Sequence, residues 1–418
     1  MRRLSKTPST KLSPYSQRLI ALSTATVHAG SRLERRVWDK SLDESVLKLL
    51  KTGRQGGIDA ALEHLFKTDL TAYDALLEST EAMSESSILE HDGKEYDVLL
   101  VAAPILAWTR FSITSGSLAP DVVNTLTSLL SSHVLCSDAR VTMAPALFSI
   151  DQLPFSHIET FGLTKRLSQA AISGAEYHMP ANRPETIPFL ADVRYLVAGV
   201  AVPAGSPIFR WQSMEDSSGS SAAKDECLAE WQKQALPSLT RLLPGCNIEL
   251  MLPEAFFSAC RKADQRIRPA SIRAATNYLT NTLDIQPSDL CVVIGGFGSA
   301  VENDFVEEYR VSFMTQSEWH VLYGIVWPVY GPDEAQQTEI IVQPEKMLDI
   351  PPDQKQESPL EQILSVLKEC GVDCEKIHSQ RFLMEFCDDC GAPLYPDLAG
   401  DLVHAEMPED IPKPGHFH

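Results

Sequence analysis

The sequence predicts a protein of the α/β or α+β class. Runs rich in Val, Ile, Leu and aromatic residues, bounded by Gly and Pro, alternate with helical stretches from residue 96 onward. The composition is ordinary for a globular protein, with 44% hydrophobic and 22% charged residues. A chain of 418 residues is long enough for two or three domains. These observations exclude a mainly disordered, collagen-like or coiled-coil chain.

The first 90 residues are expected to form a basic tail, 1–13, and a helical module, 14–90. Ser, Thr and Pro fill much of the tail, which is typical of a frayed terminus. Ser41-Leu-Asp-Glu44 fits a capping box, so a helix is expected to begin at Ser41. Apolar residues at helical spacing predict further helices from about Ala60 and Ala72.

Residues 91–213 and 225–343 are expected to be two copies of one α/β unit. Each shows an amphipathic helix, a strand ending in Pro, a helix, and a buried strand closing on Gly. A polar Ser/Gly linker separates the copies, and each is of ordinary domain size. The alternative is chance similarity between short apolar stretches. The matched segments are 126–130 with 239–243, 143–148 with 251–256, and 192–199 with 289–296.

Within these units, period-2 and helical patterns locate the individual elements. Strands are expected at 96–107, 140–148, 192–202, 207–212, 247–252, 289–296, 305–314, 318–329 and 338–343. Helices are expected at 120–134, 158–173, 227–243, 254–263 and 270–283.

A second linker, 344–357, leads to a C-terminal unit, 358–418. Ser358-Pro-Leu-Glu361 combines a capping box with Pro at the first helical position, so a helix is expected to begin there. Gly371 is expected to end it. A strand-like run at 381–386 then leads to a Cys-x-x-Cys motif.

The motif Cys387-Asp-Asp-Cys390-Gly391 is the most specific chemical signal in the chain. Two cysteines at this spacing direct both sulfurs to one point, and Gly391 allows backbone amides to face them. A hairpin is expected to follow and to carry a histidine on its return strand. Because structural Zn²⁺ takes four ligands, Cys370 and Cys374 are candidates for a second pair, with His378 and His404 as substitutes. A knuckle without metal and a redox dithiol are the alternatives.

A glycine-rich segment after the strand at 290–294 is a second candidate site. Backbone amides of Gly295, Gly296, Gly298 and Ser299 could bind a phosphate or carboxylate. The segment lacks the third Gly of a dinucleotide fingerprint and the Lys of a P-loop. A tight turn at the end of the strand is the alternative. An anion bound here would lie in a cleft between the two α/β units.

The net charge of the chain limits the classes of partner that it is expected to bind. A net charge of −20 argues against a protein that coats nucleic acid. Nucleic acid is expected, if anywhere, at the N-terminal arm, where residues 1–40 carry nine Lys and Arg against two acidic residues. A second basic run either holds an anion or forms a solvated helix face. Its members are Arg261, Lys262, Arg266, Arg268 and Arg273. No apolar run approaches the roughly 20 residues of a membrane span.

The sequence shows neither a G-x-S-x-G nor an H-E-x-x-H motif. Its nine cysteines are an odd number, and with no secretion signal they predict a reducing cytoplasmic location. The leading hypothesis is a non-enzymatic binding or regulatory protein with a structural zinc knuckle, serving an unknown protein partner or small ligand. The alternative is an enzyme that acts on a small anionic substrate in the cleft between the two units.

Several phrases resemble a known protein family. They are GSRLE at 30–34, YDVLLVAAP at 96–104 with AWTR at 107–110, and CDDCGAPL at 387–394 with VHAEMPE at 403–409. The chain resembles the β-proteobacterial family called domain of unknown function 2863. This resemblance covers most of the chain and implies a bacterial cytoplasmic protein. It implies no activity and no catalytic residue.

Overall fold

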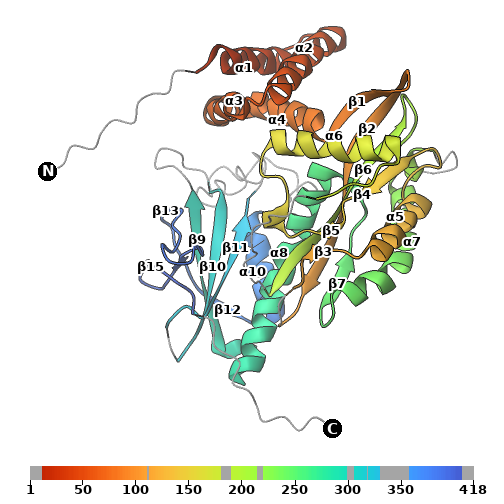
Figure 1. The fold of residues 1–418 in the computed structure, drawn as a ribbon. Coiled ribbons are helices and arrows are strands. Elements are labelled where there is room, and N and C mark those ends of the chain that lie inside the picture. Colours follow the sequence, from red (N-terminus) through yellow and green to blue (C-terminus); the bar gives the residue numbers. More distant parts are fainter. Residues whose placement is uncertain are drawn as a thin grey trace.

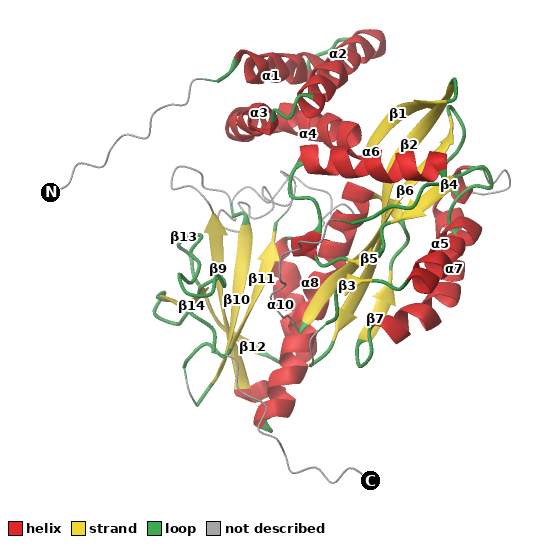
Figure 2. Ribbon diagram, viewed as in Figure 1, coloured by secondary structure: helices red, strands yellow, loops and turns green. Residues whose placement is uncertain are grey.

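The computed structural model describes residues 12–110, 113–179, 190–213, 220–298, 306–317, 319–329 and 357–406. Helices and mostly antiparallel sheets make up this part of the chain, which agrees with the α+β class. Figures 1 and 2 show three parts: an N-terminal helical module, a larger sheet covered by helices, and a smaller sheet that carries the C-terminal hairpin. The expected basic tail lies outside the described residues, apart from its last two positions.

Four helices form the N-terminal module: α1 (Pro14–Val27), α2 (Arg32–Lys51), α3 (Gln55–Thr68) and α4 (Leu70–Glu85). Their apolar stripes form one core, which includes Leu19, Leu42, Val46, Leu49, Ile58, Leu65 and Leu76. The predicted helix start at Ser41 is wrong. The helix begins at Arg32, where the Ser31 side chain accepts the amide of Glu34 at 3.1 Å. Ser41 lies inside α2, and its hydroxyl donates to the Val37 carbonyl.

The larger sheet is built around two long antiparallel strands, β2 (Lys94–Trp108) and β6 (Ala191–Pro203), which pair from Tyr96 to Trp108 along the whole of β6. β1 (Ser86–His91), β7 (Asn247–Leu250) and β8 (Glu254–Ala255) pair with β2, and β4 (Arg140–Met143) pairs with β6. A separate pair is formed by β3 (Gly116–Ser117) and β5 (Ala146–Leu147).

Helices cover both faces of this sheet, because alternate residues of β2 point to opposite faces. Val101, Ala103 and Ile105 face α5 (Pro120–His133) and α7 (Ser220–Leu242). Leu100, Ala102 and Leu106 face α6 (His157–Ser173) and the first half of α8 (Phe256–Leu283). Three short 3₁₀ turns lie at Ile150–Gln152 (η1), Arg210–Gln212 (η2) and Pro287–Asp289 (η3).

The smaller sheet has β9 (Leu290–Gly298) at its centre. β10 (Glu308–Thr315) and β11 (Tyr323–Pro328) extend it in antiparallel fashion, whereas β12 (Asp373–Ile377) and β13 (Phe382–Leu383) run parallel to β9. One face packs against the second half of α8 and against α10 (Pro359–Cys370). A hairpin of β14 (Tyr395–Pro396) and β15 (Leu402–Val403) covers part of the other face (Figure 1).

Several predicted elements need correction. The two helices expected at 254–263 and 270–283 are one continuous helix, α8, with Pro269 inside it. Pro269 is half-buried and lines a surface groove. The strand expected at 207–212 is a loop ending in the 3₁₀ turn η2. The strand expected at 338–343 lies outside the described residues.

The described elements bear on the expected duplication without deciding it. The order α5, β4, β5, α6, β6 recurs as α7, β7, β8, α8, β9. Within the larger sheet, β4 pairs with β6 whereas β7 pairs with β2. The last strands of the two series, β6 and β9, belong to different sheets. The duplication therefore stays a prediction.

Candidate metal centre in the C-terminal hairpin

The Cys-x-x-Cys motif forms a tight turn. Phe386 and Pro393 pair across its base, and the amide of Cys387 donates to the Ala392 carbonyl at 2.7 Å. The amide of Gly391 donates back to the Cys387 carbonyl at 2.8 Å. Gly391 has a φ of +72°, in the left-handed region that a residue with a Cβ rarely occupies. The predicted knuckle turn is therefore present, and Gly391 closes it.

Two cysteines and one histidine meet at this turn. The Sγ of Cys390 lies 3.2 Å from Nε2 of His404, and one ligand atom from each of Cys387, Cys390 and His404 lies within 4.8 Å of the other two. The amides of Cys390 and Asp389 donate to the Cys387 sulfur, which lowers the pKa of that thiol. Because metals bind the thiolate, this hydrogen bonding prepares Cys387 as a ligand.

The strand pair that follows brings His404 to the turn. Tyr395 pairs with Val403 and Pro396 with Leu402, as the predicted hairpin requires. The Asp397 carboxylate accepts three backbone amides of the connecting turn, at 2.8–2.9 Å. His404 directly follows β15, so the register of this short pair sets its position beside Cys390.

The other proposed ligands lie elsewhere. Cys374 packs against the core of the smaller sheet, where burial raises the pKa of its thiol to about 11. Burial also raises the pKa of Cys370, at the end of α10. His378 contacts the Asp397 carbonyl at 2.8 Å. In the described ranges, none of these three belongs to the metal-ligating group, which leaves His404 as the partner of the Cys-x-x-Cys pair.

A buried arginine holds the base of the knuckle on the smaller sheet. Arg310, on β10, is 0% exposed, and its Nη1 donates to the carbonyls of Glu385 and Leu394 at 2.7 and 2.6 Å. These two residues flank the knuckle turn on either side. The Nε of Arg310 donates to Glu308 at 2.7 Å, which balances the charge. Arg310 therefore fixes both ends of the turn at once.

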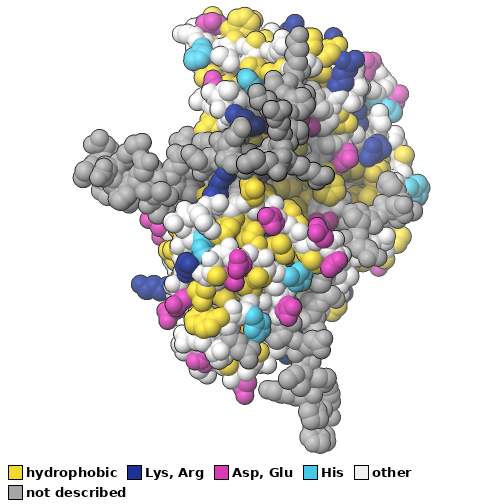
Figure 3. Space-filling view, turned by 90° about the vertical axis from the view of Figure 1, so that its left-hand side faces the viewer, with side chains coloured by type: hydrophobic (Ala, Val, Ile, Leu, Met, Phe, Trp, Pro, Cys, Tyr) yellow, Lys and Arg dark blue, Asp and Glu magenta, His cyan; other side chains and the backbone are white. Residues whose placement is uncertain are grey.

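Close packing and a hydrogen bond also hold the hairpin on the smaller sheet. The Tyr395 ring lies over Gly324 of β11, where an added Cβ would come within 2.2 Å of the ring. The hydroxyl of Ser312 donates to the Pro396 carbonyl at 2.6 Å. These contacts place the hairpin on the outer face of the smaller sheet. Figure 3 shows this side of the molecule, where hydrophobic side chains are interspersed with acidic and histidine side chains.

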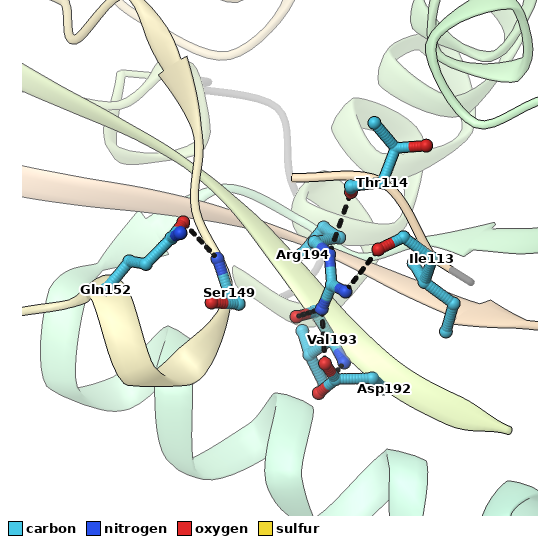
Figure 4. Close-up of polar contacts among 7 residues, drawn as sticks. All are labelled: Ile113, Thr114, Ser149, Gln152, Asp192, Val193 and Arg194. Carbon is cyan, nitrogen blue, oxygen red and sulfur yellow. Dashed lines mark hydrogen bonds and ion pairs between the residues drawn. The ribbon is translucent and has the colours of Figure 1, made fainter. Parts of the chain in front are cut away.

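A second buried arginine has the same arrangement in the larger sheet (Figure 4). Arg194, on β6, is 2% exposed and pairs with Asp192, two residues earlier on the strand. Its remaining donors reach the carbonyls of Ile113 and Thr114 at 2.7 and 2.9 Å. Burial raises the pKa of Asp192, while the adjacent guanidinium opposes that change. In both sheets an acidic-x-Arg strand segment therefore anchors a loop.

The anchoring role of Arg310 was missed by sequence reasoning. Its signal was present, because Glu308 and Arg310 share one face of a strand that is mostly buried. Asp192 and Arg194 give the same signal in β6. A charged pair at this spacing inside a buried strand indicates a partner outside the strand.

The predicted anion-binding glycines lie inside a strand. The strand expected to end at Ile294 continues to Gly298 as β9, so Gly295, Gly296 and Gly298 are ladder residues and not a turn. The fourth member of the predicted set, Ser299, lies outside the described residues. An added Cβ would come within 3.0 Å of Phe382 at Gly295 and 2.9 Å of Val306 at Gly296. Close packing explains these two glycines, and anion binding stays a prediction.

The basic run on α8 is paired with carboxylates. Its five ion pairs are Arg261–Glu81, Lys262–Glu254, Arg266–Glu249, Arg268–Asp264 and Arg273–Glu369. Arg266 and Arg273 line a groove of about 1360 Å³ between α8, α10 and the ends of β2 and β7. Asn277, Asn281 and Gln362 add polar groups to its walls. The run therefore joins neighbouring elements and borders one large polar groove.

None of the helices in the described ranges is both long and apolar enough to cross a bilayer.

Comparisons with known proteins show the family to which the chain belongs. No curated protein and no solved structure matches the chain. A family model described as "Protein of unknown function (DUF2863)" matches residues 4–417, nearly the whole chain. The chain therefore belongs to the DUF2863 family.

Proposed function

We propose that this protein binds one Zn²⁺ through Cys387, Cys390 and His404, and that the metal stabilises its C-terminal hairpin. The main support is that the Cys390 sulfur and the His404 ring nitrogen lie 3.2 Å apart, with the Cys387 sulfur close to both. The wider role is that of a non-enzymatic binding or regulatory protein.

The donor set favours zinc. Two thiolates and one imidazole form a soft set that zinc accepts in tetrahedral geometry. Asp388 and Asp389 lie within the turn and are exposed, so they add negative potential that attracts a cation. Magnesium and calcium prefer oxygen ligands, which this group does not supply.

The size of the hairpin supports a structural role for the metal. β14 and β15 have two residues each, and the hairpin adds buried Tyr395 and the partly buried Leu398, Val403 and Ala405 to a core shared with the smaller sheet. So small a unit needs a further constraint to hold one conformation, and a metal is the common solution.

Exposed apolar side chains on β12, β13 and the residue before Cys387 support a binding role. Ile377, Leu383 and Phe386 are between 43% and 53% exposed, and Phe386 directly precedes Cys387. Apolar side chains on a rigid surface are typical of protein contacts. Zinc would hold Phe386 at a fixed position on this surface.

Elemental mass spectrometry tests the proposal directly. Protein purified without chelator and without a tag is expected to carry about one zinc per chain. The Cys387→Ser/Cys390→Ser variant is expected to carry none. Cys136→Ser is the matched control, because Cys136 is also partly exposed but lies in the larger sheet's half of the molecule, and it should keep its zinc. Zinc-free wild-type protein, or zinc retained in the double variant, would contradict the proposal.

A second candidate function is catalysis on a small anionic substrate between the two α/β units. The observation that favours it is the polar groove, whose walls come from β2, α8 and α10. Its arginines Arg266 and Arg273 already contact Glu249 and Glu369, so an anion would have to displace a carboxylate. Calorimetric titration with inorganic phosphate tests this. Binding that is lost in Arg273→Gln would support the groove as an anion site, and no heat of binding would contradict it.

A further inference from the structure

We propose that an exposed stripe along α2, called here the α2 stripe, binds the surface of an anionic lipid membrane. This stripe belongs to the helical module and is separate from the metal group. Figure 1 shows α1 and α2 on the side of the module that faces away from the sheet-containing body. A bilayer can therefore approach α2 from the side opposite the body.

The beginning of α2 projects into solvent. All side chains of residues 32–37 are exposed, and the first buried residue of the helix is Leu42. Local contacts hold this end in helical form, because Ser31 accepts the amide of Glu34 at 3.1 Å and Glu34 accepts the amide of Gly30 at 2.9 Å. The end is thus ordered by its own contacts and presents its side chains outward.

The α2 stripe combines an apolar pair with cations. Leu33 and Val37 are 71% and 60% exposed, and they are neighbours because they lie about one helical turn apart. Positions three and four residues further on continue the same face. In chain order the exposed members of the stripe are Leu33, Val37, Lys40, Glu44, Lys48 and Lys51, with the exposed Arg36 at its side.

The cations of the α2 stripe are available to an anionic partner. Among the described residues, no carboxylate forms an ion pair with Arg36, Lys40 or Lys48. The nearby Asp39 is held by Arg35 at 3.8 Å. The chain as a whole carries a net charge of −20, so this cationic face is opposite in sign to the molecule that bears it. Its charge is complementary to an anionic surface.

The apolar pair favours a lipid surface over nucleic acid. Phosphates of a nucleic acid would contact the cations but would leave Leu33 and Val37 in water. An anionic bilayer matches both features, because its headgroups attract the cations and its acyl boundary accepts the apolar side chains. The α2 stripe therefore fits a membrane of anionic phospholipid.

Vesicle co-sedimentation of the full-length protein tests the inference. Wild-type protein is expected to bind phosphatidylcholine vesicles that contain about 30% phosphatidylserine, and not vesicles of phosphatidylcholine alone. The variant Arg36→Gln/Lys40→Gln/Lys48→Gln should bind the mixed vesicles about 100-fold more weakly. Leu33→Ser/Val37→Ser should bind them about tenfold more weakly.

Matched variants of the body are the controls. Lys94→Gln/Lys233→Gln/Arg241→Gln removes the same charge from exposed positions. Ile88→Ser/Phe155→Ser removes two apolar side chains that are 65% and 77% exposed. Both controls should bind the mixed vesicles as wild type does. Because every substituted side chain is exposed, all four variants should keep the wild-type unfolding midpoint.

Three results would overturn the proposal. The first is equal binding to both kinds of vesicle, and the second is wild-type affinity in either variant of the α2 stripe. The third is tighter binding to a single-stranded RNA of about 20 nucleotides than to the mixed vesicles, lost in the charge variant. That last result would assign the stripe to nucleic acid.

Discussion

The helical module and the C-terminal hairpin both pack onto the sheet-containing body, but they are stabilised in different ways. The helical module has a core of its own, with Leu19, Val46, Ile58 and Leu76 fully buried. The hairpin contributes Tyr395 to a buried core that otherwise belongs to the smaller sheet. A module of four helices can bury enough apolar surface to hold its shape, whereas a hairpin with two-residue strands cannot.

The two modules also dock differently. Gln55 of the helical module accepts the amide of Ile158 at the start of α6, at 3.1 Å. Glu85 accepts the amide of Phe257 at the start of α8, at 2.8 Å. The module thus caps two helices of the body. At the hairpin the side chain comes from the body instead, because Arg310 donates to the backbone carbonyls of Glu385 and Leu394.

The largest expected effect comes from removing that arginine. Arg310→Met leaves Glu308 and two carbonyls without their donors, and breaking a buried pair in this way costs about 3–5 kcal/mol. Amide hydrogen exchange should lose protection at 382–406 while 14–85 stays unchanged. Arg35→Met, at an exposed position of α2, is the control. Unchanged protection at 382–406 would show that Arg310 does not hold the hairpin.

The core of the helical module gives the next effect. Leu76 is 0% exposed, and Leu76→Ala should lower the free energy of unfolding by about 2–5 kcal/mol. Chemical denaturation measures this loss. Because no metal enters this core, the loss should be the same with and without a chelator. A chelator-dependent loss would contradict the separation between the two modules.

A smaller effect is expected from Glu85. Burial, as the main cause, raises the pKa of this carboxyl from 4.5 to about 7. Protonated Glu85 therefore contributes stability that is complete below pH 4.5 and is lost as the pH rises through about 7. Glu85→Gln removes this dependence and should be more stable than wild type at pH 8, on the order of 2 kcal/mol.

Thermal unfolding between pH 4.5 and pH 8 measures the Glu85 effect. Glu78→Gln, at an exposed position on the same helix, is the matched control and should keep the wild-type pH dependence. Parallel pH profiles for Glu85→Gln and wild type would show that this carboxyl does not titrate in the range.

Local signals in the sequence predicted several elements of the fold and the turns around the candidate site. The capping box at Ser358, the hairpin after Leu394 and the turn at Gly391 are confirmed, because each depends on neighbouring residues. Long-range packing explains the failures. Ser41 lies inside a helix because Ser31 already caps α2 ten residues earlier. Gly295 lies inside β9 because it pairs with Arg310 of β10, and the Phe382 ring leaves no space there for a Cβ.

The sequence alone could not select the further ligands of the candidate site, because that selection also depends on long-range packing. Spacing singled out Cys387 and Cys390 as candidate ligands but left open whether Cys370, Cys374, His378 or His404 would join them. Only the three-dimensional arrangement places Cys374 in a core and His404 beside Cys390. The Glu308–Arg310 pair signalled a partner outside the strand, but the partners themselves, Glu385 and Leu394, could not be predicted because they lie at least 75 residues away in the chain.

X-ray absorption at the zinc edge of the purified protein tests the central claim most directly. The proposed site predicts two sulfur neighbours at about 2.3 Å and nitrogen or oxygen neighbours at about 2.0–2.1 Å. His404→Ala should remove one imidazole contribution and leave both sulfurs. A shell of four sulfurs would contradict the account, because it would require Cys370 and Cys374 to leave the positions they occupy in the smaller sheet's core.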